Sequence, residues 1–105
     1  MLKSDTKEKE NIGISVFGFD LPEDDEYSAV LWNDEQTPFE FVLSIVRECF
    51  GKSIPESVKI TRTAHETGRA VILTASYEVV DAKVNYAHQV IAQFPFPLKI
   101  TIEEI

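Results

Sequence analysis

An apolar run that ends directly in a polar loop constrains this chain more than any other feature. Residues 27–32 (Tyr-Ser-Ala-Val-Leu-Trp) are rich in side chains that favour strands. The polar residues 33–36 follow. After them Thr37, Pro38 and Glu40 have the spacing of a capping box with proline at the first helical position. We therefore predict a strand, a polar loop and a helix that has Thr37 as its N-cap.

Glycine and proline divide the rest of the chain into further elements. The first helix should stop at Gly51, and the capping-box pattern of residues 53–56 begins a second helix that ends near Gly68. Residues 69–75 read as a strand, apolar enough to be central in a sheet. Ser76 can cap a third helix, and apolar and polar side chains alternate in a last strand at residues 98–103. This β-α-α-β-α-β order predicts a small α+β domain, with three helices packed on a three-stranded antiparallel sheet.

The length of 105 residues fits a single domain, which we expect to occupy residues 26–105. Residues 1–25 should form a flexible N-terminal extension. Its first ten residues are almost wholly polar, which predicts disorder. The apolar side chains between Ile12 and Leu21 form an island, which either packs on the domain or adds an edge strand.

The charge balance is acidic. The formal net charge is −8 and the isoelectric point is near 4.6. These values argue against nucleic acid and anionic membranes, whose binding needs clustered basic side chains, and they suit a cationic ligand. No apolar stretch approaches the ~20 residues of a membrane span, and no signal-peptide pattern is present. The single cysteine, Cys49, requires no oxidising compartment, so we expect a cytoplasmic protein.

The sequence offers little for catalysis or for metal binding. Cys49 shares an apolar helical face with Val42 and Val46, which favours a buried thiol. His65 and His88 have no cysteine at metal-ligand spacing, and there is no nucleophile elbow, HExxH motif or phosphate-binding glycine loop. We therefore expect no enzyme activity, no catalytic residue, no metal and no cofactor.

The loop pair Asn33-Asp34 is the best candidate for a binding site. A carboxylate beside an amide carbonyl presents acceptor oxygens to a cationic group, and the loop lies between two rigid elements. The alternative is that both residues only form a turn, since Asn and Asp are common turn residues. The pattern alone leaves both interpretations open.

Residues 33–42 (Asn-Asp-Glu-Gln-Thr-Pro-Phe-Glu-Phe-Val) resemble the N-D-[DE]-x-T-P-x-E-[FY]-V motif of the ClpS adaptor family. Residues 64–70, 77–83 and 97–103 resemble three further motifs of that family in the same order. The four matches run from about Tyr27 to Ile105. Four ordered matches are more specific than any one of them, and the resemblance implies the same element order as the pattern of the chain.

The resemblance also implies roles for individual residues. The positions of Asn33, Asp34 and His65 contact the free α-amino group of a substrate's first residue; for His65, a purely structural interaction with the helix C-terminus is the alternative. The implied hydrophobic pocket, whose positions could also be ordinary core, consists of Thr37, Phe39, Val42, Thr61, Ala64 and Leu98. Glu78 and Lys83 match positions that contact the N-terminal domain of a ClpA-type unfoldase, although both residue types are common at helix surfaces. The pocket departs from the family at Thr61, Ala64 and Phe39, where a larger aliphatic residue, valine and methionine are frequent.

The implied function is that of an adaptor. It captures proteins with an N-terminal Phe, Trp, Tyr or Leu and delivers them to a ClpA-type AAA+ unfoldase for degradation by ClpP. The alternative is a divergent domain of the same fold that regulates the unfoldase or binds another partner without delivery. The smaller side chains at Thr61 and Ala64, with the aromatic ring of Phe39, favour aromatic over leucine N-termini.

Overall fold

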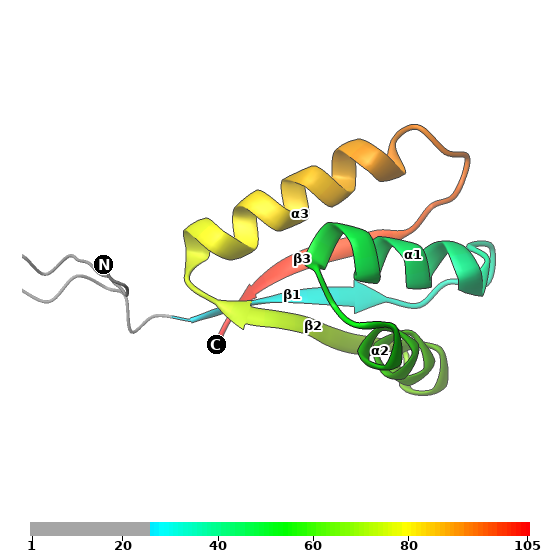
Figure 1. Cartoon of the computed structure of the whole chain (residues 1–105), viewed down its shortest axis with the longest axis horizontal. Coiled ribbons are helices and arrows are strands. Elements are labelled where there is room, and N and C mark those ends of the chain that lie inside the picture. The colour runs from blue at the N-terminus through cyan, green and yellow to red at the C-terminus, as the bar shows by residue number, and fades with distance from the viewer. Residues whose placement is uncertain (1–25) are drawn as a thin grey trace, which may run out of the picture.

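A computed structural model describes residues 26–105 of the chain (Figure 1). The expected N-terminal extension, including the apolar island between Ile12 and Leu21, lies outside the described residues. Six elements follow in the predicted order, and their bounds are β1 Tyr27–Trp32, α1 Phe39–Phe50, α2 Ile54–Thr67, β2 Arg69–Ala75, α3 Tyr77–Ile91 and β3 Lys99–Glu104. No helix within residues 26–105 is long and apolar enough to cross a membrane.

The three strands form one antiparallel sheet in the order β2-β1-β3. The central strand is therefore β1, and the prediction that residues 69–75 are central is wrong. A bulge explains the misleading pattern of β2. Val71 pairs with Val30 and Leu73 pairs with Ala29, so Ile72 is an extra residue between them. Ile72 and Leu73 can then both pack against the core, which makes an edge strand look continuously apolar.

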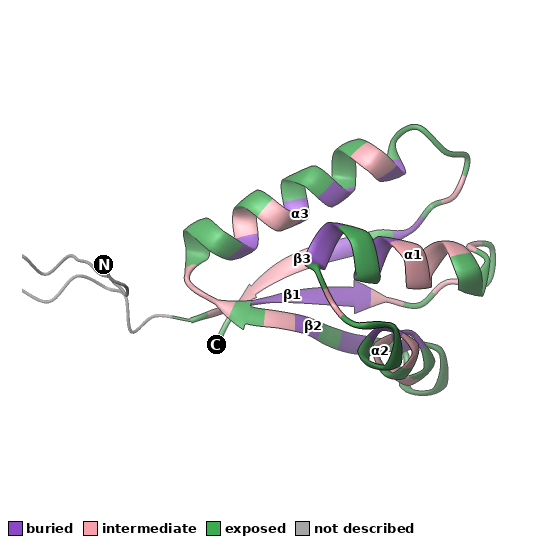
Figure 2. Ribbon diagram, in the orientation of Figure 1, coloured by how far each residue is buried: buried purple, intermediate pink, exposed green. Residues whose placement is uncertain are grey.

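The core lies between the sheet and the three helices (Figures 1 and 2). Ala29 and Leu31 of β1 are 0% and 1% exposed, and they belong to the same buried cluster as Val46 of α1 and Val80 of α3. The face that α2 buries is different, because its buried residues are the small or polar Ser57, Thr61 and Ala64. Side chains of this size fill less space between α2 and the body of the domain than leucine or methionine would.

The helix ends follow local sequence signals with two exceptions. The capping box at Ser53 and Glu56 is confirmed, and α1 ends at Gly51 in the left-handed conformation (φ 70°). Ser76 does occupy the N-cap position of α3, but its side chain makes no capping hydrogen bond. The predicted cap at Thr37 is wrong, because α1 begins at Phe39 with Pro38 as its N-cap.

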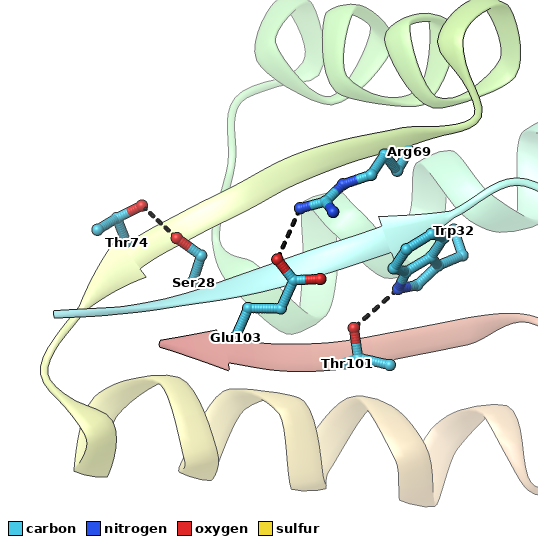
Figure 3. Close-up of polar contacts among 6 residues, drawn as sticks. All are labelled: Ser28, Trp32, Arg69, Thr74, Thr101 and Glu103. Carbon is cyan, nitrogen blue, oxygen red and sulfur yellow. Dashed lines mark hydrogen bonds and ion pairs between the residues drawn. The ribbon is translucent and has the colours of Figure 1, made fainter. Parts of the chain in front are cut away.

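The sheet face opposite the helices is closed by polar side chains (Figure 3). Trp32 lies between two cations, 5.0 Å from Arg69 Cζ and 5.3 Å from Lys99 Nζ, measured to the ring centroid. Its indole N–H donates to Thr101 at 2.8 Å, and Arg69 pairs with Glu103 across the central strand at 2.7 Å. Arg69 is the strand partner of Trp32, and Glu103 is the strand partner of Ser28, so their ion pair crosses β1 between these two positions. Val30 lies between Trp32 and Ser28 on the same face, and this cover explains why it is 0% exposed.

We predict that Leu31→Ala destabilises the domain by about 2–5 kcal/mol, because it removes a fully buried side chain and leaves a cavity in the central strand. The measurement is the free energy of unfolding from urea denaturation. Val71→Ala is the control, since Val71 on the opposite sheet face is 48% exposed and should cost less than about 1 kcal/mol. Equal losses in the two variants would contradict this description of the core.

Candidate functional site

The Asp34 carboxylate organises the loop between β1 and α1. Its Oδ1 accepts hydrogen bonds from the backbone N–H groups of Gln36 and Thr37, both at 2.8 Å. The Thr37 hydroxyl lies 3.0 Å from Oδ1 and 2.8 Å from Oδ2, so its single proton is directed at the carboxylate. Thr37 precedes Pro38, the N-cap residue of α1, and its hydroxyl donates to Asp34 within the loop, so it fixes the loop and does not cap the helix.

These hydrogen bonds also determine the charge of the site. Partial burial acts to raise the pKa of Asp34, but the bonds from the Thr37 side chain and from the Gln36 and Thr37 backbone outweigh it, and the pKa lies below the ordinary value of 3.8. Asp34 is therefore negatively charged at neutral pH. Oδ2 accepts only from the Thr37 hydroxyl, so it keeps acceptor capacity for a cationic ligand group.

A backbone hydrogen bond places Asn33 and His65, the other two polar residues of the predicted amino-group site, beside Asp34. The Asn33 N–H donates to the Gly68 carbonyl at 3.0 Å, which joins the end of β1 to the turn between α2 and β2. His65 lies in the last helical turn of α2, shortly before Gly68. Within residues 26–105, neither the Asn33 side chain nor the His65 imidazole has a hydrogen-bond partner, so both are available to a ligand.

One pocket of about 410 Å³ contains every position predicted for ligand binding. This volume is within the range of small-ligand sites. The lining residues come from β1, α1, α2, the connecting loop and the start of β3; they are Leu31, Trp32, Asn33, Asp34, Glu35, Thr37, Phe39, Val42, Thr61, Ala64, His65 and Leu98. The structure thus brings the nine predicted residues together, and their role in binding remains a prediction.

The exposure of the lining residues divides the pocket into a polar rim and a buried interior. Asn33, Glu35 and His65 are exposed, whereas Leu31, Thr61, Ala64 and Leu98 are each at most 8% exposed. Phe39 is a large apolar side chain that is 41% exposed and lines the pocket. Such an arrangement suits a ligand with a cationic polar end and an apolar side chain.

Three lining residues were missed by sequence reasoning: Leu31, Trp32 and Glu35. Trp32 and Glu35 adjoin the Asn33-Asp34 pair along the chain and Leu31 is one residue further away, and this proximity is the signal that could have identified them. Trp32 has a structural role as well. Its hydrogen bond to Thr101 (Figure 3) and its cation–π contacts with Arg69 and Lys99 hold the end of β1 immediately before Asn33.

Other reactive side chains lie away from the pocket. Cys49 is buried, and burial, together with the neighbouring Glu48 carboxylate, raises the pKa of its thiol, so that it stays protonated and unreactive. Glu78 and Lys83 are both on α3, which contributes nothing to the pocket. They are five positions apart and therefore point about 140° away from each other around the helix axis.

Comparison with known proteins supplies an independent view of the chain. The family model "ATP-dependent Clp protease adaptor protein ClpS" matches residues 22–101. ClpS adapter proteins of Desulforapulum autotrophicum and Nautilia profundicola are 37% and 32% identical, over 74% and 75% of this chain and 75% and 81% of their own. The solved structure of Agrobacterium tumefaciens ClpS2 bound to L-phenylalaninamide is 30% identical, with a TM-score of 0.73; the match covers 77% of this chain and 98% of that protein.

We predict that Thr37→Val raises the pKa of Asp34, because the isosteric change removes the side-chain hydrogen bond to the carboxylate. NMR titration of the Asp34 carboxyl group in both proteins measures this directly. Folding lowers this pKa, so the ionised group stabilises the domain above its unfolded value near pH 4, and the stabilisation is lost as the pH falls through the folded value. An unchanged Asp34 pKa in Thr37→Val would show that the hydroxyl does not contribute.

Proposed function

The chain belongs to the ClpS family of ATP-dependent Clp protease adaptors, and from this we propose that it binds the free N-terminus of proteins whose first residue is bulky and hydrophobic. It delivers them, in the cytoplasm, to a ClpA-type unfoldase that feeds ClpP. The adaptor itself performs no catalysis and needs no cofactor.

One observation carries this proposal: a single pocket joins the polar rim of Asn33, Asp34 and His65 to a buried apolar interior. A protein N-terminus has the matching form. Its α-ammonium group offers three donors and, with a pKa near 8, is mostly charged at pH 7. Asp34 supplies the opposite charge, the Asn33 carbonyl an acceptor, and neutral His65 a lone pair.

The apolar interior receives the first side chain. Leu31, Ala64 and Leu98 line it and are almost fully buried, so an apolar side chain placed there leaves water. The exposed Phe39 ring can cover the ligand from the α1 side. L-phenylalaninamide, bound by the Agrobacterium relative, combines a free amino group with a benzyl side chain, and this supports an aromatic first residue for the present chain also.

We predict that a short peptide with a free N-terminal Phe binds and that its N-acetylated form does not. Asp34→Ala should weaken binding of the free peptide by about 2–5 kcal/mol, roughly thirtyfold or more, because the ammonium group loses its charged partner in a partly desolvated site. Fluorescence anisotropy with labelled peptides is the measurement.

Two controls separate binding from folding. Asp34 also orders the loop, so circular dichroism must show that the variant is folded. Glu40→Gln removes an exposed carboxylate from the first turn of α1, outside the pocket, and should leave the affinity unchanged. A folded Asp34→Ala protein with wild-type affinity would remove Asp34 from the amino-group site.

Contact with the unfoldase should depend on α3, whereas capture of the substrate depends on the pocket. We predict that charge reversal at both positions, Glu78→Lys with Lys83→Glu, slows degradation of a reporter with an N-terminal Phe by ClpA and ClpP several-fold, while peptide affinity stays the same. Glu48→Lys on α1 is the matched reversal at an exposed position and should leave both readouts unchanged. Normal degradation with the double variant would assign unfoldase binding to another surface.

A further inference from the structure

The N-terminal half of α1 borders the pocket but contains none of the buried residues of that helix. Phe39 and Val42 line the pocket, and both lie at the start of α1. The buried residues of α1 all belong to its other half; they are Ile45, Val46, Cys49 and Phe50. The deep core therefore fixes the C-terminal half of α1, and the half beside the pocket is held by contacts nearer the surface.

Three phenylalanine side chains supply such a contact and are called the aromatic cluster below. The ring of Phe41 on α1 lies 4.9 Å from the rings of both Phe94 and Phe96, measured between centroids, with interplanar angles of 58° and 55°. Aromatic pairs attract each other at this spacing and tilt. Phe41 and Phe96 are half-buried, and Phe94 is exposed. The aromatic cluster thus joins α1 to the segment between α3 and β3.

This segment leads directly into another pocket residue. Leu98 follows Phe96 by two positions, lines the pocket and is 8% exposed. Pro95 and Pro97 flank Phe96; each proline fixes its own φ and has no backbone N–H to donate. The segment is therefore stiff, and its position relative to α1 depends strongly on the packing of side chains.

We propose that the aromatic cluster is a positioning element, which holds the Val42 and Leu98 parts of the pocket wall at the spacing that a bulky first side chain requires. Phe41 is next to Val42 on α1, and Phe96 is close to Leu98 on the opposite side of the contact. No residue of the cluster lines the pocket itself. This inference rests on the proposed function, because it names what keeps the same pocket ready for its ligand.

The physical basis is preorganisation. Where the wall already has the arrangement that the ligand needs, binding costs no energy to restore it. Where the wall also populates other arrangements, the apparent affinity falls by the fraction of molecules that are ready to bind. Loss of the ring contacts should therefore weaken binding even though no atom that touches the ligand is removed.

The first test measures peptide affinity in folded variants by fluorescence anisotropy. Phe41→Leu and Phe96→Leu keep an apolar side chain but lose the ring contact, and each should bind a peptide with a free N-terminal Phe roughly three- to tenfold more weakly. The loss stays in this range because the ligand has to restore only what the missing contact contributed. Phe41→Tyr keeps the ring and should bind like the wild type. Circular dichroism checks that each variant is folded.

The double variant Phe41→Leu with Phe96→Leu separates one shared contact from two independent effects. Both substitutions remove the same ring pair, so the second should add little to the first. The fold-loss in affinity of the double variant should then be clearly smaller than the product of the two single losses.

Tyr77→Leu is the matched control. Tyr77 packs against Tyr27 in another aromatic pair, with centroids 5.1 Å apart, and neither residue lines the pocket. Its substitution should leave the peptide affinity unchanged. Methyl NMR relaxation of the free proteins supplies a measurement that needs no peptide. The order parameters of the Leu98 methyl groups should fall in Phe41→Leu and remain at the wild-type value in Tyr77→Leu.

Four results would overturn the inference: wild-type affinity in both single variants, single losses that multiply in the double variant, an equal loss in Tyr77→Leu, or Leu98 methyl groups that stay equally ordered in Phe41→Leu. Each of these leaves the proposed function intact, because the wild type still binds the peptide through its free amine. Wild-type protein that binds no peptide, acetylated or free, would instead overturn the proposed function. The Leu98 methyl groups would then still report whether the aromatic cluster fixes the pocket wall.

Discussion

The hydrogen bond from the Asn33 N–H to the Gly68 carbonyl is the constraint on which the site depends. It continues the pairing of β1 with β2, whose last pair is Trp32 with Arg69, by one further position. Gly68 alone connects α2 to β2, and it does so with φ 100°, a conformation that few other residues adopt. The end of α2 is thereby held against the loop that follows β1, and His65 comes to line the same pocket as Asn33 and Asp34.

Asp34 shows how one side chain can be both structural and available for binding. One carboxylate oxygen is occupied by backbone N–H groups of the loop, and the other is contacted only by the Thr37 hydroxyl. The turn interpretation and the binding interpretation of the Asn33-Asp34 pair are therefore compatible. The bonds that fix the loop also keep the carboxylate ionised, so the same contacts supply the geometry and the charge that an ammonium group requires.

The pocket also relates the packing of α2 to the proposed ligand. A helix with Ser57, Thr61 and Ala64 on its buried face contributes little apolar surface to the core, which is instead supplied by the strands, α1 and α3. What this face provides is space beside Leu31 and Leu98, which line the same pocket as Thr61 and Ala64. Larger side chains than Thr61 and Ala64 would fill part of this space, so the small residues of α2 set the shape of the pocket.

The sequence by itself determined the six elements and their order, because these depend on local signals, and it identified nine of the residues that line the pocket. Strand-forming side chains, the capping box at Ser53 and the glycines at the ends of α1 and α2 act within a few residues, and the family motifs identify positions directly. Only the tertiary structure decided which strand is central, because the bulge at Ile72 arises from pairing with β1. The partner of the Thr37 hydroxyl and the unpaired hydroxyl of Thr61 were decided there too. Hydrogen bonding of a side chain depends on which acceptors the folded chain brings within about 3 Å of it, and no pattern along the sequence contains those distances.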